Sequence, residues 1–383
     1  MRVAFVGAFD PEYPRTRVLE EGLRAHGVDV RVLPAPARPL AREASLVSSW
    51  LTRAGGADAW LVPSFCHRDV PVVSLLARAA RVPLLFDPLV SRWDTQVRDL
   101  GRVPERSFAA ARLQWSDTVS LGLSDLVLCD TWEHGELFAD RFGLPRRKLA
   151  RVPVGADRAA FARGDERARA LPRNGTAPLD VLYVGGFLPL HGVSTIIQAA
   201  ALLEKRHGPE FARFTLVGDG MTAHRADRDV ASLGLRSVRR EPRLAYPRVL
   251  DALARADVAL GIFGTTDKAA RVVPHKVYQA LAVGVPTVTR RSPAVAEFFA
   301  WGRSAPAAAD AAATSPDGGE PLVLVPPGDG PALAAAIEAL ARDPKRRERI
   351  GASGRSAALS FATPERVGKT LIDAIERARS GAR

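Results

Sequence analysis

Three basic side chains stand close together in the segment Asp267–Pro286: Lys268, Arg271 and Lys276. The segment follows the apolar run Val258–Ile262, which we expect to be a buried strand that directs the segment toward a ligand cleft. Cations at such a place can bind a diphosphate and neutralise the charge that grows on it as it leaves. We assign Lys268 and Arg271 to catalysis and Lys276 to diphosphate binding. The alternative is a solvated basic loop.

Glycines follow several of the expected strands. Gly7 ends the first apolar run, Gly186 follows a run in the second half of the chain, and Gly218 with Asp219 follows another. The N–H groups of such turns can face the oxygens of an anionic ligand. The pattern GxGxxG is absent, which argues against a nicotinamide enzyme. We place these four residues in a nucleotide site, and ordinary turns remain the alternative for Gly7 and Gly218.

Three further polar residues are candidates for binding a second substrate. His67 comes shortly after the expected strand Ala59–Val62, and Arg15 and Arg17 lie at the start of the first helical pattern, beyond Gly7. Arginines at this place could meet an anionic substrate. An ordinary loop histidine and a solvated helix start are the competing interpretations.

These residues must be positioned by alternating strands and helices. Short apolar runs recur between helical patterns in both halves of the chain, which favours parallel βαβ units. The expected strands are Arg2–Val6, Val28–Leu33, Ala59–Val62, Pro83–Phe86, Leu126–Cys129, Ala150–Val152, Val181–Val184, Phe214–Val217, Val258–Ile262, Thr287–Thr289 and Val323–Val325.

The stretch Arg167–Pro178 is rich in Pro, Gly, Asn and Arg and is typical of a linker. The sequence therefore predicts an α/β fold of two Rossmann-like, doubly wound domains that face a central cleft, with ligands at the carboxyl ends of the strands. We expect an acceptor-binding domain over residues 1–170 and a donor-binding domain over 178–360. A final helix over 361–383 is expected to pack back toward the first domain, and Ala305–Gly319 is expected to be an exposed loop.

Composition excludes several classes of protein. The chain has 383 residues, of which 47% are hydrophobic and 25% charged, as in folded globular proteins. No apolar stretch is long enough to cross a membrane, and the first residues resemble a strand more than a secretory signal. The two cysteines, Cys66 and Cys129, lie in apolar runs and are too few for a zinc cluster. We expect buried thiols in a cytoplasmic protein and no metal site.

The net charge of +12 raises the question of an anionic partner. The basic residues are spread along the chain without a run of five like charges, which argues against nucleic acid. The segment Arg102–Leu123 mixes arginines with Phe108 and Trp115 and could lie on an anionic membrane, at the inner face. A simple packed helix is the competing interpretation. The oligomeric state is left open.

Four segments together resemble a known family. They are VLYVGGFLPLHGVSTIIQAA (181–200), FTLVGDG (214–220), AVGVP (282–286) and LVPPGD (324–329). In order and content they resemble the donor-binding half of the family-four glycosyltransferases. The resemblance continues in DPKRRERIGASG (343–354) and, more loosely, in VPVGAD (152–157). It implies the GT-B fold, a nucleotide-sugar donor and retention of the anomeric configuration.

The resemblance also implies roles for individual residues. Gln279 stands where the family has a ribose-binding Glu, on the helix that follows Pro274, and Arg271 stands where the family has a second Glu. Phe187 and His191 occupy the positions of the Arg and Lys that bind the diphosphate. The family's histidine in the first domain would fall near Leu89, and Asp87 is the polar residue beside it, so we assign Asp87 to catalysis. Phe187, His191, Pro274 and Gln279 join the donor site.

The sequence thus predicts a glycosyltransferase that moves a sugar, from a donor linked to UDP or GDP, to a hydroxyl of a glycan, a lipid-linked sugar or a small natural product. No cofactor is expected, because Lys and Arg supply the positive charge. Two other functions remain open. One is a sugar-nucleotide epimerase on the same fold, and the other is a catalytically inactive binding protein.

Overall fold

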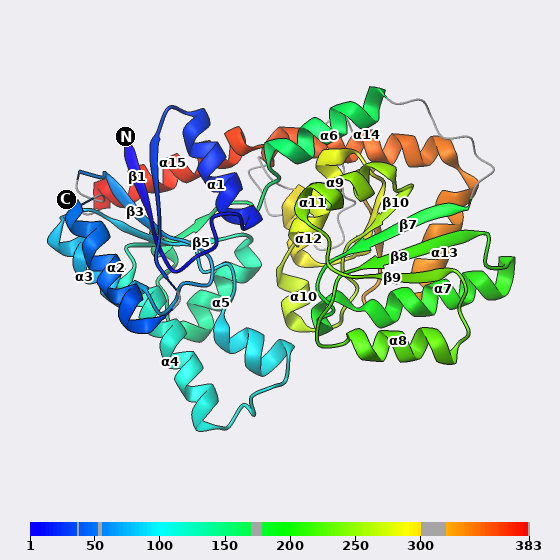
Figure 1. Ribbon diagram of the computed structural model, residues 1–383, viewed down its shortest axis with the longest axis horizontal. Coiled ribbons are helices and arrows are strands. Elements are labelled where there is room, and N and C mark those ends of the chain that lie inside the picture. The colour runs from blue at the N-terminus through cyan, green and yellow to red at the C-terminus, as the bar shows by residue number, and fades with distance from the viewer. Residues whose placement is uncertain (37, 53–55, 170–177, 300–318, 382–383) are drawn as a thin grey trace. The chain divides into compact units, whose positions relative to one another are not determined.

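The computed structural model describes residues 1–36, 38–52, 56–169, 178–299 and 319–381. The chain forms two compact units. Unit 1 comprises Met1–Asp157 and Thr363–Arg383, and unit 2 comprises Arg158–Ala362. Each unit is built on one six-stranded parallel sheet covered by helices (Figure 1). This confirms the prediction of an α/β fold with two Rossmann-like sheets.

The sheet of unit 1 has the strand order β2-β1-β3-β4-β5-β6. The strands are β1 (Arg2–Gly7), β2 (Asp29–Pro34), β3 (Ala59–Val62), β4 (Leu84–Phe86), β5 (Leu126–Cys129) and β6 (Leu149–Arg151). The helices are α1 (Pro14–Ala25), α2 (Pro39–Thr52), α3 (Val70–Ala79), α4 (Phe108–Leu123), α5 (Trp132–Phe142) and α15 (Pro364–Gly381). The strand order reverses between β1 and β3, and at such a switch point the loops leave the sheet in opposite directions and open a crevice.

The sheet of unit 2 has the order β12-β11-β10-β7-β8-β9. Its strands are β7 (Leu179–Val184), β8 (Ala212–Val217), β9 (Val238–Glu241), β10 (Val258–Leu260), β11 (Thr287–Arg290) and β12 (Val323–Val325). Its helices are α6 (Arg158–Arg169), α7 (Val193–His207), α8 (Ala223–Ser232), α9 (Tyr246–Arg255), α10 (Asp267–Arg271), α11 (His275–Val283), α12 (Pro293–Phe299), α13 (Gly330–Arg342) and α14 (Pro344–Phe361). Here the switch point lies between β7 and β10.

The central strands are apolar because helices cover both of their faces. In β3 all four residues are buried, and β4, β5 and β10 are buried along their whole length as well. This burial explains why the strands are continuous apolar runs in the sequence. The edge strand β9 reads Val-Arg-Arg-Glu and is only partly buried, so it lacks the apolar pattern from which the other strands were predicted.

The division between the units differs from the boundary expected at 170–178. Helix α6, expected in the first domain, belongs to unit 2, where it packs on α9 and α11. Arg163 of α6 pairs with Asp251 of α9 at 2.6 Å, and Arg355 of α14 donates to the carbonyl of Phe161 at 3.2 Å. The expected linker itself, over 170–177, and nearly all of the expected loop Ala305–Gly319 lie outside the described residues. Thr363–Arg383 belongs to unit 1, where α15 packs on α1.

Candidate active site

In unit 2, the loops after β7 and β10 leave the sheet on either side of the switch point and are tied together by backbone hydrogen bonds. The N–H of Phe263 donates to the carbonyl of His191 at 3.0 Å, and the N–H of Gly264 donates to that of Leu190 at 3.1 Å. The β7 loop carries Gly186 and His191, and the β10 loop continues into α10 and α11. The donor residues predicted in the second half of the chain therefore gather at one edge of this sheet, whereas Gly7 belongs to unit 1.

Two glycines let the loops after β7 and β8 approach each other closely. Gly185 and Gly218 have φ angles of 155° and 130°, which side-chain-bearing residues rarely adopt. A Cβ on Gly218 would collide with the carbonyl of Gly185, and a Cβ on Gly185 would collide with the Nζ of Lys276. The glycine at 185 thus makes room for the lysine beside the backbone of the loop.

Lys276 lies at the start of α11, and its Nζ atom is buried. Within the described part of the chain this Nζ has no hydrogen-bond partner. It lies 3.9 Å from the centre of the Tyr183 ring, whose π face attracts the ammonium. Burial lowers the pKa of Lys276 well below its usual value. A buried cation without a partner is costly, so the site is built to receive an anion.

His191 lies beside the same Tyr183 ring. Its Nδ1 is bonded to the carbonyl of Gly186, which also accepts a hydrogen bond of 2.6 Å from the hydroxyl of Tyr183. Burial, and then the positive charges of Lys276 and Lys268, lower the pKa of His191 well below its usual value. A neutral His191 that donates from Nδ1 to a carbonyl leaves Nε2 as an acceptor. The same effect shows that both lysines lie within electrostatic reach of His191.

The helices α10 and α11 carry the remaining predicted donor residues. Lys268 is buried on α10, which begins where the Thr266 hydroxyl accepts a hydrogen bond from the N–H of Ala269 at 3.3 Å. Arg271 ends the same helix. Pro274 caps α11, and Gln279 lies buried one turn after Lys276. The N-terminus of α11 adds the positive end of a helix dipole beside Lys276.

The turn after β8 contributes Gly218 and Asp219 to a cavity of about 680 Å³ at the carboxyl ends of β8 and β9. Asp219 accepts a hydrogen bond from the N–H of Gly220 at 2.7 Å. The predicted donor contact of Phe187 is wrong. Its side chain is fully buried, and its N–H already donates to the carbonyl of Asp219 at 3.0 Å. Arg240, which also lines the cavity, stacks over the Phe187 ring at 4.3 Å.

Three residues of unit 2 were missed by the sequence analysis. Tyr183 holds Lys276 and Gly186, Arg240 lines the cavity, and Arg290 ends β11 with its guanidinium bonded to the carbonyl of Gly264. Burial lowers the pKa of Arg290. The signal for Arg290 is a charged residue at the last position of a short strand, at the carboxyl end where ligands bind. Tyr183 and Arg240 stand inside strands, where the sequence gives no sign that they face a ligand.

In unit 1, the predictions for Arg15 and Asp87 are wrong. Both side chains are buried, and Arg15 binds both carboxylate oxygens of Asp87, at 3.1 and 3.2 Å. Arg15 also donates to the carbonyl of Pro153, and Ser64 donates to Asp87 at 3.2 Å. A buried ion pair with both partners saturated connects α1 to the end of β4. Asp87 is therefore not free to act as a catalytic base, nor Arg15 to bind an acceptor.

Gly7 and Arg17 stay at the carboxyl edge of the unit 1 sheet. The N–H of Ala8, directly after Gly7, donates to Asp69 of the β3 loop at 2.6 Å, which closes the loops at the switch point. Arg17 is partly exposed and pairs with the buried Asp157 at 3.0 Å. Arg17 thus remains able to reach a ligand, with its guanidinium oriented by a carboxylate.

His67 is buried below this edge. Its ring stands edge-on to Phe86, and its Nε2 lies 3.7 Å from Asp117. Burial, and then the charge of Arg92, lower the pKa of His67 to about 3. Only 2% of His67 is exposed, so the predicted contact with a second substrate is wrong for the conformation described. Its neighbours Phe65 and Leu89 have positive φ angles of 69° and 58°, a strained conformation for side chains of this kind.

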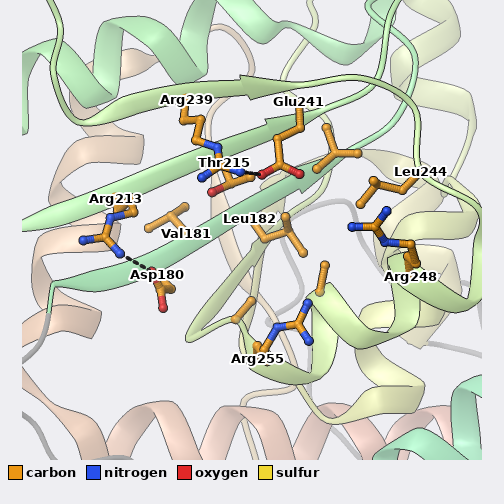
Figure 2. Close-up of a pocket in the computed structure, with 13 residues that line it drawn as sticks. Asp180, Val181, Leu182, Arg213, Thr215, Arg239, Glu241, Leu244, Arg248 and Arg255 are labelled. Atoms are coloured by element: carbon orange, nitrogen blue, oxygen red, sulfur yellow. Dashed lines mark hydrogen bonds and ion pairs between the residues drawn. The ribbon is translucent and has the colours of Figure 1, made fainter.

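A second cavity, of about 420 Å³, lies elsewhere in unit 2 (Figure 2). Its lining runs along the faces of β7, β8 and β9 and one side of α9, and it does not include the loops that carry Lys268 and Lys276. Figure 2 shows four arginines around it, two of which pair with acids: Arg213 with Asp180 and Arg239 with Glu241; the others are Arg248 and Arg255. It is separate from the candidate active site.

Among the described residues no group of His, Cys, Asp and Glu is arranged to hold a metal ion. No described helix is long and apolar enough to cross a membrane. Cys66 and Cys129 are buried, and neither forms a disulfide bond within the described residues.

The sequence is similar to those of known glycosyltransferases. A family model described as "Glycosyl transferase-like" matches residues 195–373. The D-inositol 3-phosphate glycosyltransferase of Kineococcus radiotolerans is 30% identical over 345 residues, which cover 86% of this chain and 71% of that protein. The enzyme of the same name from Acidothermus cellulolyticus is 34% identical over 97 residues, 24% of this chain and 21% of that one.

Solved structures show the same fold at lower identity. The sucrose-phosphate synthase of Thermosynechococcus elongatus aligns with a TM-score of 0.70 at 17% identity and covers 100% of both chains. Anabaena HepE in complex with UDP-glucose aligns with a TM-score of 0.67 at 16% identity, over 98% of this chain and 99% of that one. Both likenesses cover the two units of the chain.

Proposed function

Because the chain belongs to the family-four glycosyltransferases with the GT-B fold, we propose that it transfers a sugar from a nucleotide-diphosphate sugar to an acceptor hydroxyl with retention of configuration. The observation that carries this proposal is the buried Nζ of Lys276, which has no hydrogen-bond partner among the described residues. It lies beside the glycine loop of β7, at the N-terminus of α11. A diphosphate there would receive a charge-assisted hydrogen bond that the protein leaves unmade.

The donor diphosphate binds Lys276, and Lys268 and Arg271 of α10 neutralise the charge that develops as the sugar–phosphate bond breaks. Phosphate also lies at the positive end of the α11 dipole. Gln279 accepts a hydrogen bond from the ribose, and the turn at Gly218 and Asp219 borders the nucleotide. UDP is the first nucleotide to test, because the HepE structures contain UDP and UDP-glucose.

Retention follows from attack on the same face that the leaving group departs from. The bond between the anomeric carbon and the phosphate oxygen breaks, the bond to the acceptor oxygen forms, and the acceptor proton passes to the leaving phosphate oxygen. The charge on this oxygen is balanced by Lys268, Arg271 and Lys276. The proposal therefore requires no metal ion and no organic cofactor.

Unit 1 takes the acceptor, with Arg17 at the edge of its sheet. The relatives' name specifies an inositol phosphate acceptor, which makes that compound the first to test, before glycans, lipid-linked sugars and small natural products. The buried thiols of Cys66 and Cys129 suit a reducing compartment, so we place the reaction in the cytoplasm.

The test is a titration of the protein with UDP, GDP and ADP, followed by transfer from the sugar form of the nucleotide that binds. We expect Lys276→Met to weaken nucleotide binding about 10- to 100-fold, because it removes a hydrogen bond between charged groups. Lys205→Met is the matched control. Lys205 is exposed on α7 of the same unit. The variant Lys205→Met should therefore bind nucleotide like the parent protein.

Each outcome separates the alternatives. Absence of binding to every nucleoside diphosphate, or unchanged binding by Lys276→Met, would contradict the proposed site. Conversion of the donor sugar without an acceptor would indicate an epimerase. Binding without transfer to any acceptor would indicate an inactive homologue. NMR of the product's anomeric proton decides between retention and inversion.

A further inference from the structure

Helix α4 distributes its side chains in an unusual way. Its face toward the protein buries Asp117 and Ser120, while Phe108 and Trp115 are 85% and 67% exposed. These two aromatic residues are seven positions apart, so they lie on the same side of the helix, about two turns from each other. Figure 1 shows α4 extending from unit 1 on the side away from α1 and α15.

Helix α4 thus buries polar side chains and exposes aromatic ones. The structure explains only the buried polar side chains. Asp117 accepts hydrogen bonds from the Ser91 hydroxyl at 2.7 Å and from the N–H of Trp93 at 2.9 Å, so it anchors the β4 loop. Ala110 and Leu121 complete the packing of α4 on the unit. Nothing in the packing of the described residues explains why the opposite face carries a Phe and a Trp.

The charges around this face are positive and unpaired. Arg102, Arg106 and Arg112 are exposed, and within the residues that the structure describes none of them forms an ion pair. The charges of Arg68 and Arg112 help to lower the pKa of Arg92, after burial, which shows that like charges gather beside the helix. An acidic surface would complement such a cluster.

From these observations we propose that the exposed face of α4 docks on an anionic lipid bilayer, with Phe108 and Trp115 inserted at the headgroup level and the arginines on lipid phosphates. Aromatic side chains flanked by basic residues on one face of a helix suit this interface. The inference does not depend on the proposed reaction.

The experiment is co-sedimentation of the full chain with vesicles of phosphatidylcholine alone and of phosphatidylcholine with phosphatidylglycerol. We expect binding to the anionic vesicles only. The double variant Phe108→Ala, Trp115→Ala should bind about tenfold more weakly or worse, because it loses apolar surface that enters the bilayer. Its unfolding midpoint should match the parent, since both side chains are exposed. Leu233→Ala, an exposed apolar residue beyond α8, is the control and should bind normally.

The charge contribution is measured separately. Arg106→Gln and Arg112→Gln should each weaken binding about fivefold, the worth of one basic residue near an anionic surface. Lys205→Gln, an exposed cation of unit 2, should have no effect. Equal binding to neutral and anionic vesicles, no binding to either, or unchanged binding by the double variant would overturn the proposal. Self-association that the double variant abolishes, without vesicle binding, would assign the face to a second copy instead.

Discussion

Lys276 is a basic residue whose surroundings favour its neutral form over its charged form. Burial lowers the pKa of Lys276, and burial with the neighbouring lysine charges lowers the pKa of His191. A bound diphosphate brings negative charge next to both groups and favours their charged forms. Ligand binding and proton binding at this site are therefore linked.

We predict that UDP binding takes up protons in the pH window between the free and bound pKa values of Lys276 and His191. Because the anion raises the pKa of Lys276 and His191 from their lowered values in the free protein, nucleotide affinity should fall as pH rises through the window between free and bound pKa values. Calorimetry in buffers of different ionisation enthalpy measures the uptake directly. Lys276→Met should remove a substantial part of it, and uptake unchanged by this variant would show that the protons go elsewhere.

His67 gives unit 1 a defined response to acid. The pKa of His67 is about 3 in the folded protein and 6.5 when unfolded, so between these values the unfolded chain binds the additional proton. The free energy of unfolding therefore falls with decreasing pH below 6.5, and above 6.5 His67 has no effect. The facing Asp117 acts in the opposite sense, because burial raises the pKa of Asp117 and acid relieves that penalty. Arg92, the third charged group here, stays protonated.

We predict that urea unfolding shows a loss of stability between pH 7 and pH 5 that is about 2 kcal/mol larger in the parent protein than in His67→Gln. This figure is 1.4 kcal/mol per pH unit over the roughly 1.5 units below the unfolded pKa. Asp117 and Arg92 are present in both proteins, so the difference reports His67. An identical loss in the two proteins would mean that His67 is protonated in the folded state.

Among the elements, α1 and α15 of unit 1 approach each other closely enough to bring their backbones into contact. Gly22 and Gly368 face each other there. A Cβ built on Gly22 would lie 2.8 Å from the Cα of Gly368, and a Cβ on Gly368 would collide with the carbonyl of Gly22. The obstructing atoms belong to the backbone, which cannot move aside as a side chain can.

We predict that Gly368→Ala destabilises unit 1 by about 1–3 kcal/mol, the usual penalty for overpacking. Gly122→Ala is the control, because a Cβ there meets nothing within 4 Å. Gly122 is also helical, so alanine should leave stability unchanged or raise it by up to about 1 kcal/mol. Chemical unfolding of both variants measures the difference. Equal stability of Gly368→Ala and the parent would mean that the helices separate at little cost.

The elements were largely predictable from the sequence, and the roles of the charged residues in unit 1 were not. The expected strands Ala59–Val62 and Leu126–Cys129 coincide with β3 and β5, since a buried strand must be apolar throughout. Strand β9 was missed because an edge strand can be polar. Arg15 was assigned to the site because it begins the first helix beyond Gly7, and Asp87 because it lies beside the position of the family's histidine. Their pairing joins residues 72 positions apart, which no local pattern reveals.

At the scale of the whole chain, unit 2 is continuous in sequence and unit 1 is not. Unit 1 combines Met1–Asp157 with Thr363–Arg383, whereas the predicted donor residues of the second half, from Gly186 to Gln279, lie within Arg158–Ala362. A ligand that binds one folded unit stabilises that unit. Nucleotide binding should therefore stabilise unit 2, whereas the contact between α15 and α1 should stabilise unit 1.

We predict two unfolding transitions in scanning calorimetry. UDP at 100 times its dissociation constant should stabilise one of them by about 2.7 kcal/mol and leave the other in place. Gly368→Ala should lower the transition that UDP does not affect. A single transition that responds to both changes would show that the two units unfold as one.

The position of α15 has a consequence for synthesis on the ribosome. Domains usually fold in the order in which they emerge, at about 5–20 residues per second. Here the first 157 residues leave the ribosome without the helix that covers α1, and the 205 residues of unit 2 follow before it arrives. The delay amounts to roughly 10–40 s at these rates. The unit that begins the chain is thus completed last, and during that interval its uncovered face is a natural target for a nascent-chain chaperone.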